Sequence, residues 1–253
     1  MPELLDRYGD RAAELAATLT PNQFAVILKS FAQAQHRHDK MLKAFTKRIP
    51  PRLPHFLPLN HATVCASYAK LMEKEDGLFR RISAEMPHKL PLFEGRHIAL
   101  VANAYARMDI RDDLLFDDFA DEVLRRPHEL EHVDLVLLAS AFGHFKIRNH
   151  RLWLVLADHL RNSYIDLKAK EIAAVLNAMS AVDFKHDSLL RTLCACLCEP
   201  EILEEMEPST LGLALNAFSK LQWSGHGNSE AIRALAERAV ALSASLMSVA
   251  VAQ

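Results

Sequence analysis

Large hydrophobic residues flanked by small ones recur along the chain at an almost constant spacing. The central residues of this pattern, called anchors below, lie 37, 37, 37, 37 and 39 residues apart: Phe31, Tyr68, Tyr105, Phe142, Met179 and Phe218. The residues directly before and after each anchor are Ala, Ser or Gly. Hydrophobic residues also stand at positions −4 and +3 from each anchor, which places them on the anchor's face of a helix. Each copy of the pattern therefore predicts a helix, called helix A below, whose small residues allow close approach of a neighbouring helix.

A second hydrophobic group follows each of the first five anchors, at positions +10, +11 and +14. This i, i+1, i+4 spacing is helical and predicts helix B after a short polar turn. Leu4, Leu5 and Tyr8 stand 37 residues before the equivalent group of the first full repeat, so the sequence opens on helix B of an incomplete repeat. Thr20 and Gln23 have the spacing of a capping box at the start of the first helix A.

One such helix pair cannot bury its hydrophobic face alone, so the copies are expected to stack. We therefore predict an all-α fold, a right-handed α-solenoid of about six 37-residue helix-turn-helix repeats in a single domain. On this prediction the anchors are core residues, and not aromatic platforms for bases. The period sets helix B of the incomplete repeat at 1–19 and the repeats at 20–56, 57–93, 94–130, 131–167, 168–206 and 207–253.

Three segments carry a resemblance to a known repeat family. They are 100–108 (LVANAYARM), 175–180 (VLNAMS) and 213–221 (LALNAFSKL), which share an Asn-Ala-hydrophobic core. This repeat resembles the heptatricopeptide repeats, close relatives of the octotricopeptide repeats. The resemblance implies work on organellar RNA, in transcript maturation, stability or translation or as a component of a mitochondrial ribosome, and a mitochondrial location. Many such proteins end in a RAP domain, which this chain lacks, so the nuclease-like activity proposed for that domain is not expected.

The surface stripe of helix A is predicted at positions −9, −6, −2 and +2. Amides and hydroxyls supported by Lys and Arg can contact base edges and phosphates of single-stranded RNA. The alternatives are a solvated helix face, or Asn side chains that bond locally across repeats. The candidate RNA-binding residues are Lys29, Lys70, Arg96, Asn103, Arg107, Ser140, His144, Lys170, Asn177, Asn216 and Lys220.

Composition supports the helical prediction and limits the RNA prediction. Gly occurs 7 times in 253 residues and aromatic residues make up 7%, which argues against sandwiches and barrels. Thirty Lys and Arg against 32 Asp and Glu give a net charge of −2, so no global positive field points to nucleic acid. Charge is nevertheless segregated, with basic stretches at 36–52 and 143–170 and acidic ones at 112–134 and 199–207. Basic turns can hold phosphates and acidic ones can face a basic protein; a solvated mixed surface is the alternative.

Enzyme and metal motifs are weak. Residues 128–132 read HELEH, the zinc-protease pattern H-E-x-x-H, but they follow Pro127 in the linker between two repeats. The four cysteines are interpreted as reduced, mostly packed thiols: Cys65, Cys194, Cys196 and Cys198. Neither they nor His36 and His38 have metal-ligand spacing. We therefore expect no enzyme activity, no cofactor and no metal.

These observations favour a non-enzymatic, RNA-associated scaffold in an organellar ribonucleoprotein, with a mitochondrial ribosome as the favoured assembly. RNA and neighbouring proteins are the expected partners. The apolar segment 239–252 is too short to span a membrane and is predicted to lie at an interface. The alternative is a protein-interaction solenoid, an accessory subunit of another mitochondrial complex; buried protein contacts at positions −2 and +2 would favour it.

Overall fold

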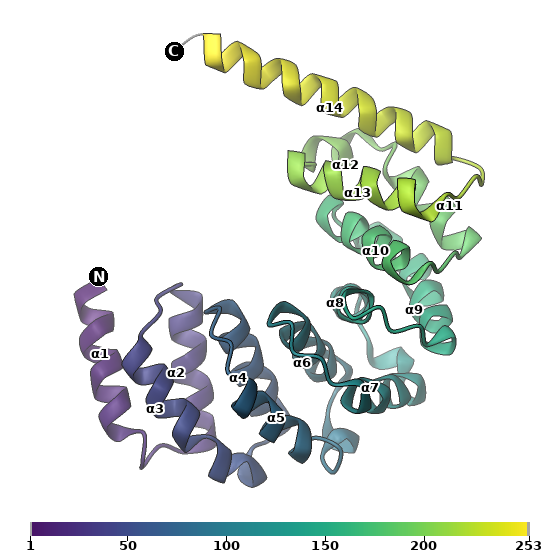
Figure 1. Ribbon diagram of the computed structural model, residues 1–253. Helices are drawn as coiled ribbons and strands as arrows, with labels where there is room; N and C mark the ends of the chain where they lie inside the picture. Colours follow the sequence, from purple (N-terminus) through teal and green to yellow (C-terminus); the bar gives the residue numbers. More distant parts are fainter. Residues whose placement is uncertain (1, 252–253) are drawn as a thin grey trace. The chain divides into compact units, whose positions relative to one another are not determined.

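The computed structural model describes residues 2–251, with side chains described for 3–243, and these residues form helices and no strand. The all-α prediction is confirmed (Figure 1). The elements are α1 (Pro2–Leu15), α2 (Pro21–Gln33), α3 (Asp39–Arg48), η1 (Pro50–His55), α4 (Pro58–Lys70), α5 (Asp76–Glu85), η2 (Leu90–Leu92), α6 (Gly95–Arg107), α7 (Asp113–Arg125), η3 (Pro127–Glu129), α8 (His132–His144), α9 (His150–Asn162), η4 (Tyr164–Asp166), α10 (Ala169–Val182), α11 (Asp187–Cys196), α12 (Pro200–Glu205), α13 (Pro208–Leu221) and α14 (Asn228–Val251).

Each predicted repeat range holds one helix A and one helix B, and α1 lies in the range of the incomplete repeat. The helices A are α2, α4, α6, α8, α10 and α13, and each begins one residue after the predicted start of its repeat. The helices B are α3, α5, α7, α9, α11 and α14, while η1 to η4 and α12 form the linkers. The handedness of the stack and the single-domain organisation stay predictions.

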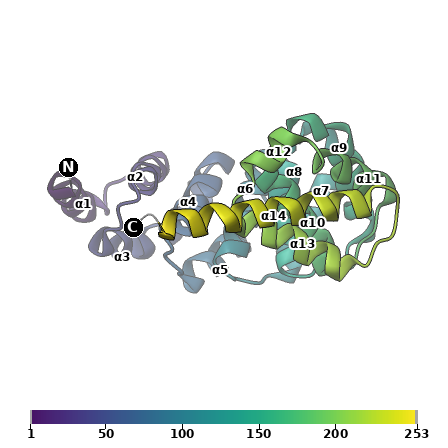
Figure 2. The same ribbon diagram turned by 90° about the horizontal axis from the view of Figure 1, so that it is seen from above.

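The helices fall into two compact units, Met1–Leu130 and Glu131–Gln253, divided where the third and fourth predicted repeats meet. In the first unit α2 packs against α4 and α4 against α6, with α1 against α3. In the second unit α8, α10 and α13 pack in succession, and α11 packs between α9 and α14. Figure 2 shows α14 lying along α13. Within each unit, helices of one type therefore stack on their neighbours in a solenoid-like manner.

The anchors form the core, as the sequence predicts. All six are at most 5% exposed: Phe31, Tyr68, Tyr105, Phe142, Met179 and Phe218. The two tyrosines also bond to the preceding helix B. Tyr68 Oη lies 3.1 Å from Thr46 Oγ1, and Tyr105 Oη donates to the carbonyl of Phe79 at 2.8 Å and lies 3.0 Å from Ser83 Oγ. Buried phenol groups thus find partners, as buried polar groups require.

Every helix A ends in a left-handed residue at position +4, and none of these residues is glycine. Their φ angles lie between 47° and 55°: Gln35, Met72, Asp109, Lys146, Asp183 and Gln222. In the first five repeats, the N–H of the following residue donates to the anchor carbonyl at 2.9–3.0 Å, as in a Schellman motif. This turn repeats with the anchor period and directs the chain into helix B.

Basic side chains at position +21 join consecutive repeats of the first unit. Arg52 donates to the carbonyl of Ala17, and Arg126 donates to the carbonyl of Phe93 at 2.8 Å. Lys89 Nζ donates to three carbonyls of the preceding linker at 2.6–3.1 Å: Leu53, Pro54 and Phe56. We call these three residues the cation staples. Arg52 belongs to the basic stretch 36–52, so part of that positive charge serves the fold.

Gly143 marks a close approach between two helices A, α8 and α10. A Cβ atom at this position would lie 2.7 Å from both Cα and Cβ of Ala178 in α10. Replacing Gly143 by alanine is therefore expected to lower the free energy of unfolding by about 1–3 kcal/mol, because α8 and α10 must separate. Urea unfolding followed by circular dichroism measures the change.

Gly212→Ala in α13 is the matched control, because a Cβ there meets nothing within 4 Å. This variant is expected to be more stable than the wild type by about 1 kcal/mol, through helix propensity alone. Equal effects of the two substitutions would contradict the close packing of α8 and α10.

Candidate nucleic-acid interface

The structure places all eleven candidate RNA-binding residues on helices A, each exposed or half-buried. The predicted stripe is wrong at position −6. Its residues are buried in the first five repeats because −6 lies two turns before the small residue at +1, on the side where the next helix A packs: Ala25, Ala62, Ala99, Val136 and Ala173. The surface passes through position −5 instead.

Position −5, outside the predicted stripe, gives the helix-A face a mainly hydrophobic row. Its members are exposed or half-buried: Val26, Thr63, Leu100, Leu137, Ala174 and Leu213. Exposed Leu59 and Val133 add to it at position −9. The polar candidates gather nearer the C-terminal ends of the helices, at −2 and +2. The face is therefore mainly hydrophobic at −5 and polar at −2 and +2, whereas position −9 is mixed, since Arg96 and Lys170 stand there as well.

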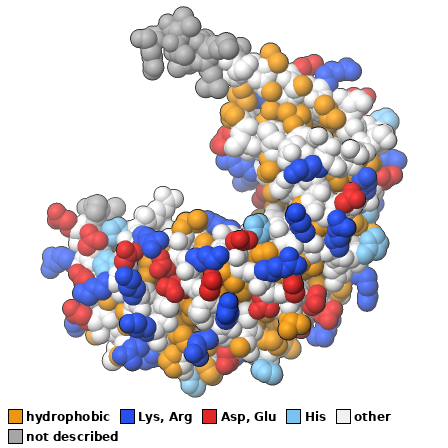
Figure 3. Space-filling view, viewed as in Figure 1, with side chains coloured by type: hydrophobic (Ala, Val, Ile, Leu, Met, Phe, Trp, Pro, Cys, Tyr) orange, Lys and Arg blue, Asp and Glu red, His pale blue; other side chains and the backbone are white. Residues whose placement is uncertain are grey.

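Two of the candidate cations are already paired with carboxylates. Arg96 Nε lies 2.8 Å from Glu94, and Lys170 Nζ lies 2.9 Å from Glu207, which precedes α13. Both pairs are exposed, and such pairs contribute little stability. Other candidate cations have no ion pair among residues 3–243: Lys29, Lys70, Arg107 and Lys220. On the face shown in Figure 3, basic and acidic side chains are intermixed.

The candidate asparagines do not bond across repeats. In the part of the chain that the structure describes, the side-chain amides of Asn103, Asn177 and Asn216 make no hydrogen bond. This finding removes one alternative explanation of the −2 row. Their donors and acceptors remain available to a ligand.

Four candidates come together in a groove of the second unit. Ser140 and His144 of α8, Asn177 of α10 and Lys220 of α13 line a cavity of about 350 Å³. Lys146, the left-handed residue after α8, lines it as well. The remaining lining residues are mostly small, namely Gly143, Ala174, Ala178 and Ala181, with Leu213. The close packing of small residues thus leaves a hollow bordered by two ammonium groups, an amide, a hydroxyl and an imidazole.

The sequence-based prediction did not include a row of cations at position +6, although the anchor period is enough to identify it. Each of the first five repeats has an exposed Lys or Arg there: Arg37, Lys74, Arg111, Arg148 and Lys185. Arg37 and Arg111 lie 2.8 Å from the aspartates at position +8, Asp39 and Asp113. In the fourth repeat His150 replaces that aspartate, and Arg148 has no ion pair among the described residues.

The H-E-x-x-H segment does not form one helix. His128 lies in η3 and His132 begins α8, and Leu130 between them is extended with φ −87° and ψ 127°. A zinc protease needs both histidines on one face of a continuous helix. Among residues 3–243 no group of three or more His, Cys, Asp or Glu side chains could hold a metal ion.

The cysteines are free thiols, of which only Cys198 is exposed. Burial raises the pKa of Cys194 to about 12 and also raises the pKa of Cys65. Such thiols stay protonated and react slowly.

The predicted interface at 239–252 lies largely outside the described side chains, which end at residue 243. Val240 is exposed on α14. Within the described part of the chain, no helix combines the length and the hydrophobicity that crossing a bilayer requires.

The stacked helix pairs define the chain as a helical-repeat protein. Residues 52–253 match the family of the RNA-editing substrate-binding complex 6 protein (RESC6), and the chain belongs to that family. The match includes every residue of the groove. No individual curated protein matches the chain.

Proposed function

We propose that the protein is a non-enzymatic scaffold subunit of an RNA-editing substrate-binding complex, and that it holds RNA in the groove of its second unit. The family match supports the assembly and the association with RNA. The groove supports the binding surface, because it gathers Lys146, Lys220, Asn177, Ser140 and His144 around one hollow.

The groove suits a short stretch of single-stranded RNA. Its two ammonium groups can neutralise phosphates, while the amide of Asn177 and the hydroxyl of Ser140 can bond to base edges or ribose. The net charge of −2 implies few phosphate contacts. Weak RNA contact combined with contacts to neighbouring proteins is the mode of binding that follows.

Changing Lys146 and Lys220 to alanine together is expected to weaken RNA binding and its dependence on salt. Each phosphate contact to single-stranded nucleic acid contributes about 0.7 to the slope of log K against log salt concentration. The double variant should therefore lose about 1.4 of that slope. Fluorescence anisotropy with a labelled single-stranded RNA, between about 50 and 200 mM salt, measures both quantities.

The control changes Arg151 and Arg191 to alanine, which removes the same charge from exposed sites on helices B. These residues lie outside the groove, so affinity and slope should stay near the wild-type values. An equal loss in both double variants would show non-specific attraction, and the groove would then have no special role.

The mitochondrial location and the heptatricopeptide type of the repeat belong to this proposal and rest on the resemblance of the repeats. The same resemblance favours a mitochondrial ribosome. We propose the editing complex in its place, because the family match names that assembly. Co-purification of the tagged protein with either assembly distinguishes the two.

A second candidate function is a scaffold that binds only proteins, including the predicted accessory subunit of another mitochondrial complex. The hydrophobic row at position −5 favours it, because half-exposed leucines suit protein contacts better than phosphates. Crosslinking of the assembled complex, with peptide mapping of α6 and α8, separates RNA contacts at −2 and +2 from protein contacts at −5.

The non-enzymatic part of the proposal is supported by the interrupted helix at the H-E-x-x-H segment and by the packing of the buried cysteines. Stoichiometric zinc in the purified protein would count against it.

A further inference from the structure

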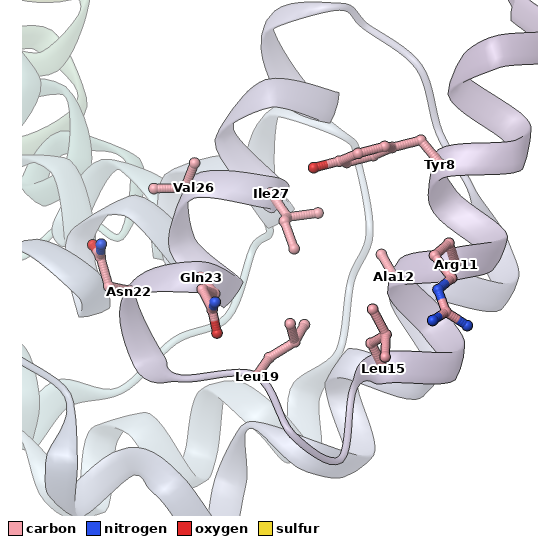
Figure 4. A pocket seen from close by; sticks show the side chains of 9 residues that line it. All are labelled: Tyr8, Arg11, Ala12, Leu15, Leu19, Asn22, Gln23, Val26 and Ile27. Carbon is pink, nitrogen blue, oxygen red and sulfur yellow. The ribbon is translucent and has the colours of Figure 1, made fainter.

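A hydrophobic groove lies between α1 and α2, in the first unit. It encloses about 400 Å³ and is lined from α1 by Tyr8 and Leu15 and from α2 by Val26 and Ile27, among others (Figure 4). Tyr8 is 56% exposed and Val26 is 55% exposed. Large hydrophobic side chains thus face an open space that no described residue fills.

The equivalent positions one repeat later are covered. Tyr8 corresponds to Phe45, which is fully buried, and Ile27 corresponds to Val64, which is 1% exposed. The side chain that packs on Phe45 belongs to α2. The ring of Phe24 lies 4.7 Å from that of Phe45, edge to face, and the guanidinium of Arg52 lies 5.7 Å from the Phe24 ring. In this repeat, α2 therefore fills the groove between α3, the helix B of its own repeat, and α4, the next helix A.

We propose that the groove between α1 and α2 binds an amphipathic α-helix of a partner protein, seated as α2 is seated one repeat later. The stack of helices A then continues by one member beyond α2. This inference concerns protein assembly and is independent of RNA binding by the second unit.

The way α2 packs defines the chemistry of the bound helix. Phe24, Leu28 and Phe31 of α2 are fully buried, which gives hydrophobic residues at i, i+4 and i+7. Small residues must stand near the last of these, because helices A approach closely. Arg11 and Glu14 pair at 2.9 Å at the edge of the groove, so the polar face of the partner helix meets both signs of charge.

A second copy of this chain is a poorer occupant. Each described helix A has its anchor buried within its own unit. To offer such a helix to another molecule, a copy would have to unfold one of its repeats. A partner protein can offer an amphipathic helix without that cost.

The probe for this site is a fluorescently labelled peptide with the sequence of residues 20–34, held helical by a hydrocarbon staple on its polar face. Saturable binding to the full chain is expected by fluorescence anisotropy. Val26→Lys in the protein should weaken binding at least about ten-fold, since it places a charge in the hydrophobic groove. Leu114→Lys on α7 is the matched control, because Leu114 is 80% exposed and lies outside the groove.

A peptide with serine in place of Phe24 and Leu28 should not bind. Several results would overturn the proposal. The first is that the peptide shows no saturable binding, or that it binds the Val26→Lys and wild-type proteins with equal affinity. The second is self-association of the protein that Val26→Lys abolishes, which assigns the groove to a second copy. The third is protection of Tyr8 from hydroxyl radicals in the isolated protein.

Discussion

Tyr105→Ala is expected to lower the free energy of unfolding by about 3–5 kcal/mol, the range for removing a buried aromatic side chain. Tyr105 is fully buried and packs edge to face on Phe79, with ring centroids 4.9 Å apart. Truncation leaves a cavity between α5 and α6 and removes a donor from the carbonyl of Phe79. Urea unfolding of the wild type and the variant, followed by circular dichroism, measures the loss.

Two variants separate the causes of this loss. Tyr105→Phe keeps the ring and removes only the hydroxyl, so a loss of about 1 kcal/mol is expected. Tyr164→Ala removes a tyrosine of η4 that is 41% exposed, and its effect should be much smaller, about 0.5 kcal/mol. If Tyr105→Ala were as mild as Tyr164→Ala, the anchors could not be the core of the repeats.

Acid is expected to destabilise the first unit through His61. This side chain is fully buried, and neither ring nitrogen has a hydrogen-bond partner. Burial, followed by the nearby charge of Lys89, lowers its pKa to about 3. Between its ordinary pKa of 6.5 and about 3, the unfolded chain binds a proton that the folded chain does not. Stability should therefore fall as the pH falls through this window, by about 1.4 kcal/mol per pH unit.

His61→Phe is expected to remove this pH dependence. The equivalent residue of the first repeat is Phe24, and the ring at position 61 already lies between Phe56 and Phe93, with centroids 5.4 and 6.0 Å away. The variant should also be more stable at neutral pH by about 1–3 kcal/mol, because no polar group is left unsatisfied. Urea unfolding at about pH 5 and about pH 7.5 tests both statements. The same acid loss in wild type and variant would show that another group is responsible.

Each helix A begins one residue after the boundary that the anchor period predicts for its repeat, because the period reflects the stacking of like helices. Thr20 and Gln23 illustrate the local part of this success. Thr20 Oγ1 accepts from the Gln23 N–H at 3.3 Å, and Gln23 Oε1 accepts from the Thr20 N–H at 2.8 Å. A capping box depends on four consecutive residues, so pattern suffices to predict it.

Features that depend on the neighbouring repeat were harder to predict. The cation staples donate to backbone carbonyls of the preceding repeat. Every residue has such a carbonyl, so the sequence does not show which one accepts. Position −6 was placed on the surface because helical phase alone does not say how closely two helices A approach. The residues at position +4 are not glycine, the residue that usually marks a left-handed turn. The sequence therefore predicted a turn after helix A but not its left-handed conformation.

The candidate site was predicted in part for a related reason. Periodicity identified Ser140, His144, Asn177 and Lys220 as members of one stripe, and the structure brings them to one groove. Lys146 was missed because it lies just past the end of α8, where the left-handed turn directs it to the groove. The stripe of the first unit carries the same residue types at −2 and +2, but the sequence does not say which members share a hollow.

The cation staples have a consequence for how the first unit comes apart. Arg52, Lys89 and Arg126 are half-buried, and each donates to a carbonyl of the repeat before its own. If one repeat opens, the next loses its cation bond to the preceding repeat, so its own folded state is weakened in turn. The effect is largest at Lys89, which loses all three carbonyl acceptors, whereas Arg52 keeps the carbonyl of Arg48 and Arg126 keeps Glu122. Opening at one end therefore propagates, and the first unit should melt as a single cooperative block, without intermediates that lose one hairpin at a time.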